Sequence, residues 1–202
     1  MKRFFLAAAM LCTLFSCAPA GSQAGADFED LLVSRRSVRD FDASRSISEA
    51  EVRTIIEASQ QAPSWANTQT TRYYVAISPE KADAVRELIG ERNKQNTAGA
   101  PVFALSTFVK GQAGYFRGSA ANELGDVWGV YDNGLNNAYF VLKARAMGFD
   151  TLIIGGRDAE GLRSLFSVPA EECITAVIAL GYRASEPRQP VHKPVEEIVK
   201  FF

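Results

Sequence analysis

Three arginines and a serine stand close together in the segment from Arg35 to Arg39, which reads Arg-Arg-Ser-Val-Arg. An arginine side chain carries a permanent charge and a planar fork of donors that matches the oxygens of a phosphate. In an extended backbone alternate residues point the same way, so Arg35, Ser37 and Arg39 would share one face and Arg36 the other. The segment therefore predicts an anion site. The alternative is a solvated basic surface paired with acidic neighbours.

A second group of small polar residues runs from Pro63 to Gln69, in the order Pro-Ser-Trp-Ala-Asn-Thr-Gln. Pro63 is expected to end the preceding helix and to expose the backbone that follows. Ser64, Asn67 and Gln69, together with the backbone at Trp65, offer short polar groups around an uncharged ring. The alternative is an ordinary polar loop.

A pair of glycines follows a short apolar run in Ile153-Ile154-Gly155-Gly156. Glycine has no side chain to crowd a reactive ligand, so this turn predicts a close approach of backbone to a bound molecule. The alternative is a tight turn that needs glycine for its own geometry.

Local signals predict the helices and strands that would carry these segments. Ser48 and Glu51 form a capping box, which predicts a helix ending before Pro63. Apolar residues recur at helical spacing from Asp126 to Met147, which predicts one long helix. Further helices are expected to begin at Asp27, Ser78 and Asp158, strands are expected at 73–78, 102–109, 151–154 and 174–180, and irregular or extended structure is expected at 111–125 and 183–195.

The mixture of helices and strands lacks a strict β-α-β alternation, which favours an α+β sandwich over a doubly wound fold. The sequence also lacks the G-x-G-x-x-G motif of dinucleotide-binding folds. A length of 202 residues with 47% hydrophobic residues suits one domain. The net charge of −1 gives no electrostatic reason to expect nucleic acid as a partner. One histidine and three cysteines are too few to build a zinc site at close spacing.

The N-terminus has the features of a secretory leader. Lys2 and Arg3 precede an apolar stretch at 4–15 that is too short to span a bilayer as an ordinary helix. The following residues resemble a bacterial lipobox that ends at Cys17. We therefore expect a signal peptide at 1–16, a lipid anchor on Cys17 as the only membrane attachment, a flexible tether at 17–26 and a domain at 27–202. Export to the bacterial cell envelope would follow, and the alternatives are an ordinary signal peptide or an uncleaved anchor.

In this order and at these spacings, the segments resemble the nitroreductase-like family of flavin mononucleotide (FMN) oxidoreductases. The resemblance covers roughly residues 28–202. It is carried by R-R-S-x-R at 35–39, P-S-x-x-N-x-Q at 63–69, A-P-V at 100–102, the long helix ending in Met147-Gly148, I-I-G-G at 153–156 and H-K-P-V-E-E-I at 192–198.

The resemblance implies a three-layer α-β-α sandwich with a mixed, mainly antiparallel sheet, assembled as an intertwined homodimer with FMN between the subunits. It implies that Arg35, Arg36 and Ser37 hold the phosphate and ribityl chain, and that Arg39 lies near the pyrimidine edge of the ring. No side chain is expected to act as acid, base or nucleophile, because the flavin carries the chemistry. The residues implied to bind the cofactor are Arg35, Arg36, Ser37, Arg39, Pro63, Ser64, Trp65, Asn67, Gln69, Ile154, Gly155, Gly156, His192 and Lys193.

The implied reaction moves two electrons from a reduced donor, with NAD(P)H expected, through flavin N5 to a small acceptor such as a nitroaromatic or a quinone. Two positions depart from the family pattern: Thr70-Thr71 stands where Pro-Trp is common, and His192 stands where the tail often supplies an arginine. The alternatives are dehalogenation or flavin cleavage on the same fold, a lipid-anchored module that binds flavin without turnover, and an interaction protein without cofactor.

Overall fold

The computed structural model describes residues 28–202, so the expected signal peptide, Cys17 and the tether lie outside the described residues. In chain order the elements are α1 (Phe28–Ser34), α2 (Glu49–Ser59), η1 (Trp65–Asn67), β1 (Thr71–Ala76), α3 (Pro79–Glu87), α4 (Glu91–Asn96), β2 (Val102–Val109), β3 (Tyr115–Phe116), β4 (Ser119–Ala120), α5 (Val127–Ala146), β5 (Asp150–Ile154), α6 (Ala159–Phe166), β6 (Glu172–Gly181) and η2 (Val195–Glu197).

Four strands form one sheet in the order β1-β2-β6-β5, and each neighbouring pair is antiparallel. β2 and β6 occupy the centre, which explains why their sequences are almost continuously apolar. A parallel bridge between Ser37 and Thr151 adds the arginine segment to the outer edge of β5. The expected α+β fold with a mainly antiparallel sheet is confirmed.

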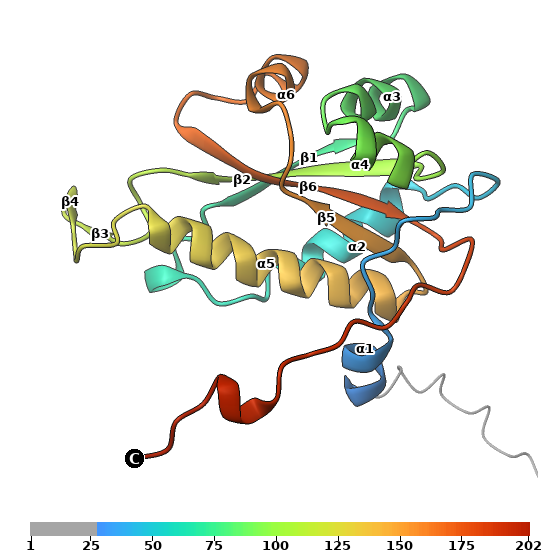
Figure 1. Ribbon diagram of the computed structural model, residues 1–202. Helices are drawn as coiled ribbons and strands as arrows, with labels where there is room; N and C mark the ends of the chain where they lie inside the picture. Colours follow the sequence, from blue (N-terminus) through green and yellow to red (C-terminus); the bar gives the residue numbers. More distant parts are fainter. Residues whose placement is uncertain (1–27) are drawn as a thin grey trace, which may run out of the picture.

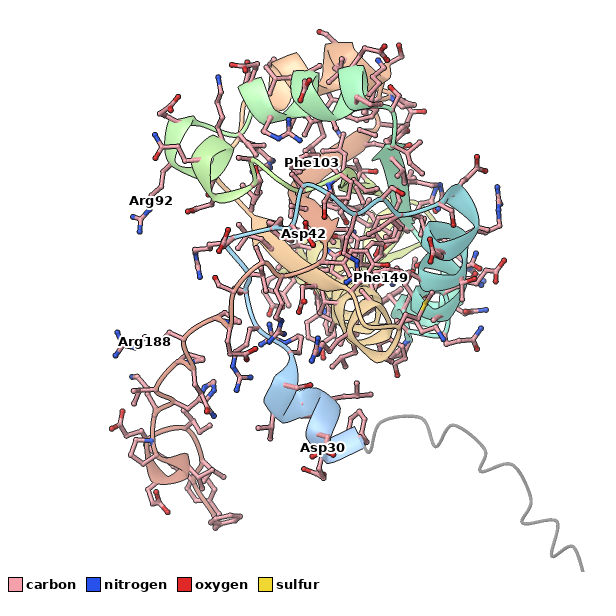
Figure 2. The ribbon with its side chains drawn as sticks, turned by 90° about the vertical axis from the view of Figure 1, so that its right-hand side faces the viewer. Asp30, Asp42, Arg92, Phe103, Phe149 and Arg188 are labelled. Carbon is pink, nitrogen blue, oxygen red and sulfur yellow. The ribbon has the colours of Figure 1, made fainter. Side chains whose placement is uncertain are left out.

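Helices cover both faces of the sheet, with α3, α4 and α6 on one side and α2 and α5 on the other (Figure 1). Alternate residues of β2 point to opposite faces, so Phe103 and Leu105 join one core cluster while Val102 and Ala104 join the other. Figure 2 shows Phe103 toward the first helix layer and Phe149 toward the second. The three-layer α-β-α arrangement expected from the resemblance is therefore present.

Most of the expected elements are observed, with shifted ends. The Ser48 hydroxyl accepts a hydrogen bond from the amide of Glu51, and the Glu51 carboxylate accepts one from the amide of Ser48, which completes the predicted capping box. β1 begins and ends two residues earlier than expected. The prediction missed the short helix α4 and the β3–β4 hairpin inside the segment taken as irregular.

The long helix α5 buries a polar face. Asp132, Asn133, Asn136 and Asn137 are buried against the sheet. Asn133 and Asn137 hydrogen-bond to side chains that include Ser106, Thr175 and Tyr73. The opposite face is apolar and exposed, with Val127, Val130, Tyr131, Ala138 and Tyr139 open to solvent. The apolar spacing thus predicted the helix correctly, but most of these apolar residues do not enter the core of this chain.

Both ends of the described chain also expose apolar side chains. α1 buries no residue, and Phe28, Leu32 and Val33 are exposed. Residues 182–185 still bond to the body of the protein. The end of the tail, around η2, lies away from it (Figure 1), with Ile198, Phe201 and Phe202 exposed. Within residues 28–202, none of the helices has the length and hydropathy needed to cross a membrane.

Candidate functional site

The arginine segment lies in extended form along the edge of β5, directly after α1. The amide of Val38 donates to the carbonyl of Thr151 at 3.0 Å, and the Val38 side chain is buried in the core. Ser37 and Arg39 on either side of Val38 are exposed, as strand alternation requires. Val38 therefore fixes the segment to the sheet and leaves its polar neighbours free.

The three arginines of this segment have no acidic partner in the part of the chain that the structure describes. The Arg36 guanidinium donates to the carbonyl of Arg35 at 2.8 Å, and that of Arg39 donates to the carbonyl of Ser37 at 3.2 Å. None of the ion pairs formed by residues 28–202 includes Arg35, Arg36 or Arg39. Among residues 28–202, the acidic partners that the alternative of a solvated basic surface would need are therefore not found, and the anion site stays a prediction.

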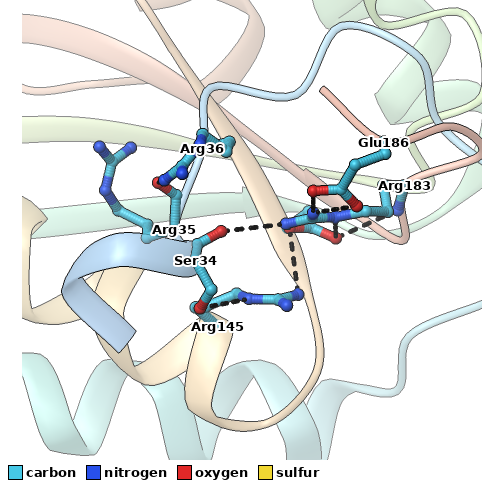
Figure 3. Close-up of polar contacts among 7 residues, drawn as sticks. Ser34, Arg35, Arg36, Arg145, Arg183 and Glu186 are labelled. Carbon is cyan, nitrogen blue, oxygen red and sulfur yellow. Dashed lines mark hydrogen bonds and ion pairs between the residues drawn. The ribbon is translucent and has the colours of Figure 1, made fainter. Parts of the chain in front are cut away.

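A buried ion-pair cluster holds the start of this segment (Figure 3). Arg183 donates to both oxygens of Asp150 at 2.9 and 2.6 Å and to the carbonyl of Ser34 at 3.3 Å. Arg145, at the end of α5, donates to the Ser34 hydroxyl at 3.3 Å and to Asp150 at 3.4 Å. The hydrogen bonding of the Arg183 guanidinium to the Asp150 carboxylate is the main cause that raises the pKa of Arg183. Arg145 and Arg183 thus pair with Asp150, whereas the neighbouring Arg35 and Arg36 form no ion pair among the described residues.

Sequence reasoning missed this cluster because its members are far apart in the chain. Asp150 stands at the start of a short apolar strand, where an acid is unusual and could have indicated a buried charge. Its partners Arg145 and Arg183 come from α5 and from the residues after β6, so no shared sequence motif connects the three. Only the fold brings these three charged residues together.

The Pro63–Gln69 loop lies between α2 and β1 and contains the short turn η1. Ala66, Asn67 and Gln69 have φ values of 43°, 57° and 49°, in the left-handed region that non-glycine residues rarely adopt. The Ser64 hydroxyl accepts from the amide of Gln69 at 3.1 Å. The Gln69 side chain donates to the Asn67 side chain at 3.1 Å. The loop therefore has an unusual backbone conformation, and its amides at positions 65, 67, 68 and 69 donate within this chain instead of being free. That its polar side chains surround a ring stays a prediction.

α5 anchors this loop at Trp65. The Trp65 amide donates to the Asp132 carboxylate at 2.8 Å, and its ring packs on Trp128 with centroids 4.8 Å apart. Burial raises the pKa of Asp132, while the hydrogen bond from Trp65 acts in the opposite direction. Sequence reasoning missed Asp132, because it lies among the polar residues of α5, and a polar stripe on a helix usually faces solvent.

The glycine pair follows β5 in an open region. Ile154 is buried, whereas Gly155 and Gly156 are exposed. Neither glycine has a positive φ, and a side chain built on Gly155 would meet nothing within 4 Å. Neither the backbone conformation nor packing among the described residues therefore requires glycine at position 155, and its expected role beside a ligand stays a prediction.

The tail residues are placed elsewhere. His192 makes no hydrogen bond or ion pair with any described residue, and Lys193 approaches Glu197 at 3.5 Å. Both side chains are exposed. Within one chain, His192 and Lys193 therefore do not join the arginine segment.

The two polar segments themselves lie far apart in one chain. The arginine segment is at the β5 edge of the sheet, beside the end of α5, and the Pro63–Gln69 loop leads into β1 at the other edge. Asp132 contacts the loop and Arg145 contacts the start of the arginine segment, thirteen residues further along α5. At 1.5 Å per residue, this spacing corresponds to about 20 Å along the helix.

Comparisons with known proteins agree on one family. The model of the nitroreductase family matches residues 32–182. YdgI of Bacillus subtilis, whose name describes a candidate NAD(P)H nitroreductase, is 28% identical, with 87% of this chain and 97% of YdgI covered. The protein DrgA of Synechocystis is 27% identical, with 79% and 86% covered.

Solved structures show the same fold. A nitroreductase family protein from Streptococcus pneumoniae superposes with a TM-score of 0.77 at 21% identity, covering 87% of this chain and all of the other. A protein from Exiguobacterium sibiricum, solved in complex with FMN, gives a TM-score of 0.76 at 22% identity, covering 87% and 97%. The family match extends over most of the chain and includes the arginine segment, the Pro63–Gln69 loop and the glycine pair. This chain belongs to the nitroreductase family.

Proposed function

We propose that this protein is an FMN-dependent oxidoreductase that moves two electrons from NAD(P)H to a small acceptor such as a nitroaromatic or a quinone. The observation that carries the proposal is the set of three arginines that have no acidic partner among residues 28–202 and lie on an extended segment fixed to the sheet. A phosphate group of the cofactor would satisfy these charges. The similarity to YdgI and to a protein solved with FMN supports this choice of donor and cofactor.

The residues present fit FMN at both ends of the molecule. Arg35, Arg36 and Ser37 would hold the phosphate and ribityl chain, and Arg39 would lie near the ring. At the Pro63–Gln69 loop a cavity of about 350 Å³ is bordered by Thr68, whose buried hydroxyl has no hydrogen-bond partner among the described residues. A polar ring edge would satisfy such donors and acceptors.

FMN, when bound, supplies the electron transfer itself, taking a hydride from the donor and passing electrons to the acceptor. The contribution of this chain is to bind and orient. The fixed charge of Arg39 would favour negative charge at the ring edge, which stabilises the reduced cofactor. The Ser64 and Asn67 side chains would orient the ring, and the open backbone at Gly155 would leave room for a donor.

We further propose that the protein is a homodimer and that each site contains residues of both chains. The arginine segment and the Pro63–Gln69 loop are about 20 Å apart along α5, too far to contact one ring from both sides. Antiparallel pairing of two α5 helices would bring the loop of one chain to the arginine segment of the other. The exposed apolar face of α5 suits such a pairing, and the apolar end of the tail suits an intertwined arrangement.

Export remains part of the proposal and rests on the leader alone. Lys2, Arg3, the apolar stretch at 4–15 and Cys17 support secretion and a lipid anchor in the cell envelope. Mass spectrometry of the membrane fraction would detect the cleaved, acylated Cys17. An unmodified N-terminal methionine in that fraction would contradict the anchor.

The cofactor is tested by the absorbance spectrum of the purified protein with added FMN and NAD(P)H, without oxygen. A shifted flavin band that NAD(P)H bleaches is expected. A bound flavin that NAD(P)H does not bleach would instead favour another donor or the non-catalytic module. Arg35→Ala should weaken FMN binding about tenfold, whereas Arg39→Ala should slow reduction more than binding. Arg53→Ala on α2 is the matched control, because the exposed Arg53 pairs with the likewise exposed Glu49.

The dimer is tested by light scattering on Val130→Glu, which places a charge in the exposed apolar face of α5. The expected result is a monomer that loses FMN, although Val130 belongs to neither polar segment. Thr54→Glu, on an exposed face of α2, should leave both properties unchanged. A monomer that retains FMN at full stoichiometry would refute a shared site.

A further inference from the structure

Asp132 is a buried acid without a cation. It is 2% exposed, and none of the ion pairs formed by residues 28–202 includes it. Among the described residues, its carboxylate accepts a single hydrogen bond, from the Trp65 amide at 2.8 Å. Burial raises its pKa, which reflects the cost of removing a carboxylate from water. The described residue that hydrogen-bonds to this carboxylate is Trp65, in the Pro63–Gln69 loop. This contact gives a reason for a buried acid at position 132.

The backbone of that loop is strained and is only partly held by its own hydrogen bonds. Three left-handed residues follow Trp65, at positions 66, 67 and 69. Such conformations persist when the surroundings determine them. The amides of Asn67 and Thr68 donate within the loop, to the carbonyls of Ser64 and Trp65. The Trp65 amide, in contrast, donates outward to α5.

Trp65 is held to α5 at two points. Trp128 and Asp132 stand one turn apart on the helix, and the first packs on the Trp65 ring while the second accepts from its amide. The position of α5 therefore sets the position of Trp65, and with it the start of the strained turn.

We infer that Asp132 is a positioning residue: its carboxylate holds the Trp65 backbone so that Ser64 and Asn67 keep the arrangement that binds the flavin ring. The flavin in this inference rests on the proposed function, whereas the contact between α5 and the loop is seen in the structure. Asp132 does not have to touch the cofactor. Its effect passes through the backbone of the loop.

The two tryptophans of the sequence provide a readout without cofactor. Trp65 and Trp128 have ring planes inclined by 50° and centroids 4.8 Å apart. Two indoles in such contact give a coupled far-ultraviolet circular dichroism signal. No other tryptophan is present to obscure it. We expect Asp132→Ala to weaken this signal in the cofactor-free protein and to raise the Kd for FMN about tenfold.

Asp132→Asn should keep the circular dichroism signal and bind FMN within about threefold of wild type, because the amide oxygen still accepts from Trp65. Asn137→Ala is the matched control. Asn137 is buried on the same face of α5 but bonds to Tyr73 and Ser106, not to the loop. It should lower the melting temperature while leaving the signal and the Kd unchanged.

Retention of wild-type FMN affinity in Asp132→Ala would overturn the inference, as would equally poor binding by the asparagine and alanine variants. Should the alanine variant not fold, amide hydrogen exchange in the wild-type protein decides. Slow exchange at Trp65 supports the contact, and fast exchange refutes it. If the wild-type protein binds no FMN, the proposed function fails, while the tryptophan signal and the exchange still test the contact separately.

Discussion

Replacing Arg183 by alanine should destabilise the fold by about 3–5 kcal/mol, because it leaves a buried carboxylate without its main partner. The side chain of Asp150 is 2% exposed, and that of Arg183 is 16% exposed. After the substitution the Asp150 carboxylate would keep the hydrogen bond from the backbone amide of residue 183 at 3.3 Å and the contact with Arg145 at 3.4 Å, but it would lose both bonds from the guanidinium of Arg183. The carbonyl of Ser34, at the start of the arginine segment, also loses a donor.

The loss of stability is large because the Arg183–Asp150 pair is buried. The pair between Arg183 and Glu186 contributes little, because the Glu186 side chain is 78% exposed and solvent screens it. The pair with Asp150 is shielded from solvent, so breaking it exposes the full cost of an unpaired charge. For a domain of this size, the loss corresponds to a fall in melting temperature of roughly 10 °C.

Urea unfolding followed by circular dichroism measures the effect, with Arg53→Ala as the control. Arg53 pairs with Glu49 across an exposed helix turn, so its loss should cost less than about 0.5 kcal/mol. The double variant Asp150→Leu, Arg183→Met should recover much of the stability, because neither charge is then left alone. A cost below about 1 kcal/mol for Arg183→Ala would refute the reasoning, since it would mean that water reaches Asp150.

Three further changes test other parts of the fold. Gly129→Ala should destabilise the protein in thermal melts despite the better helix propensity of alanine, because the new Cβ would overlap the ring of Phe108 in the core. Ser48→Ala should cost about 1 kcal/mol in urea unfolding by removing the cap of α2. Burial raises the pKa of folded Asp132, so the folded protein keeps this proton at pH values where the unfolded chain has released it. As the pH rises above the ordinary aspartate range, wild type should therefore lose stability relative to Asp132→Asn. A pH-independent difference between these two proteins in urea unfolding would contradict the last expectation.

Local signals in the sequence were sufficient for most of the elements. The capping box at Ser48 and Glu51, the cap at Asp158 and the apolar runs of β2 and β6 depend on neighbours within a few residues, and all are observed. The hairpin at 115–120 and the helix α4 were missed because both are short and lack a clear apolar period.

The sequence by itself determined the α+β fold and the long helix α5, because these follow from propensity and periodicity. It also indicated the polar segments 35–39 and 63–69, because their side-chain chemistry can be recognised without a structure. Only the tertiary structure decided which face of α5 is buried, since a polar stripe can pack inside when the sheet satisfies its hydrogen bonds, as Ser106 does for Asn133. Asp132 and Trp65 are separated by 67 positions in the sequence, and Asp150 and Arg183 by 33 positions. Such pairs leave no local pattern, and the fold alone brings them within hydrogen-bonding distance.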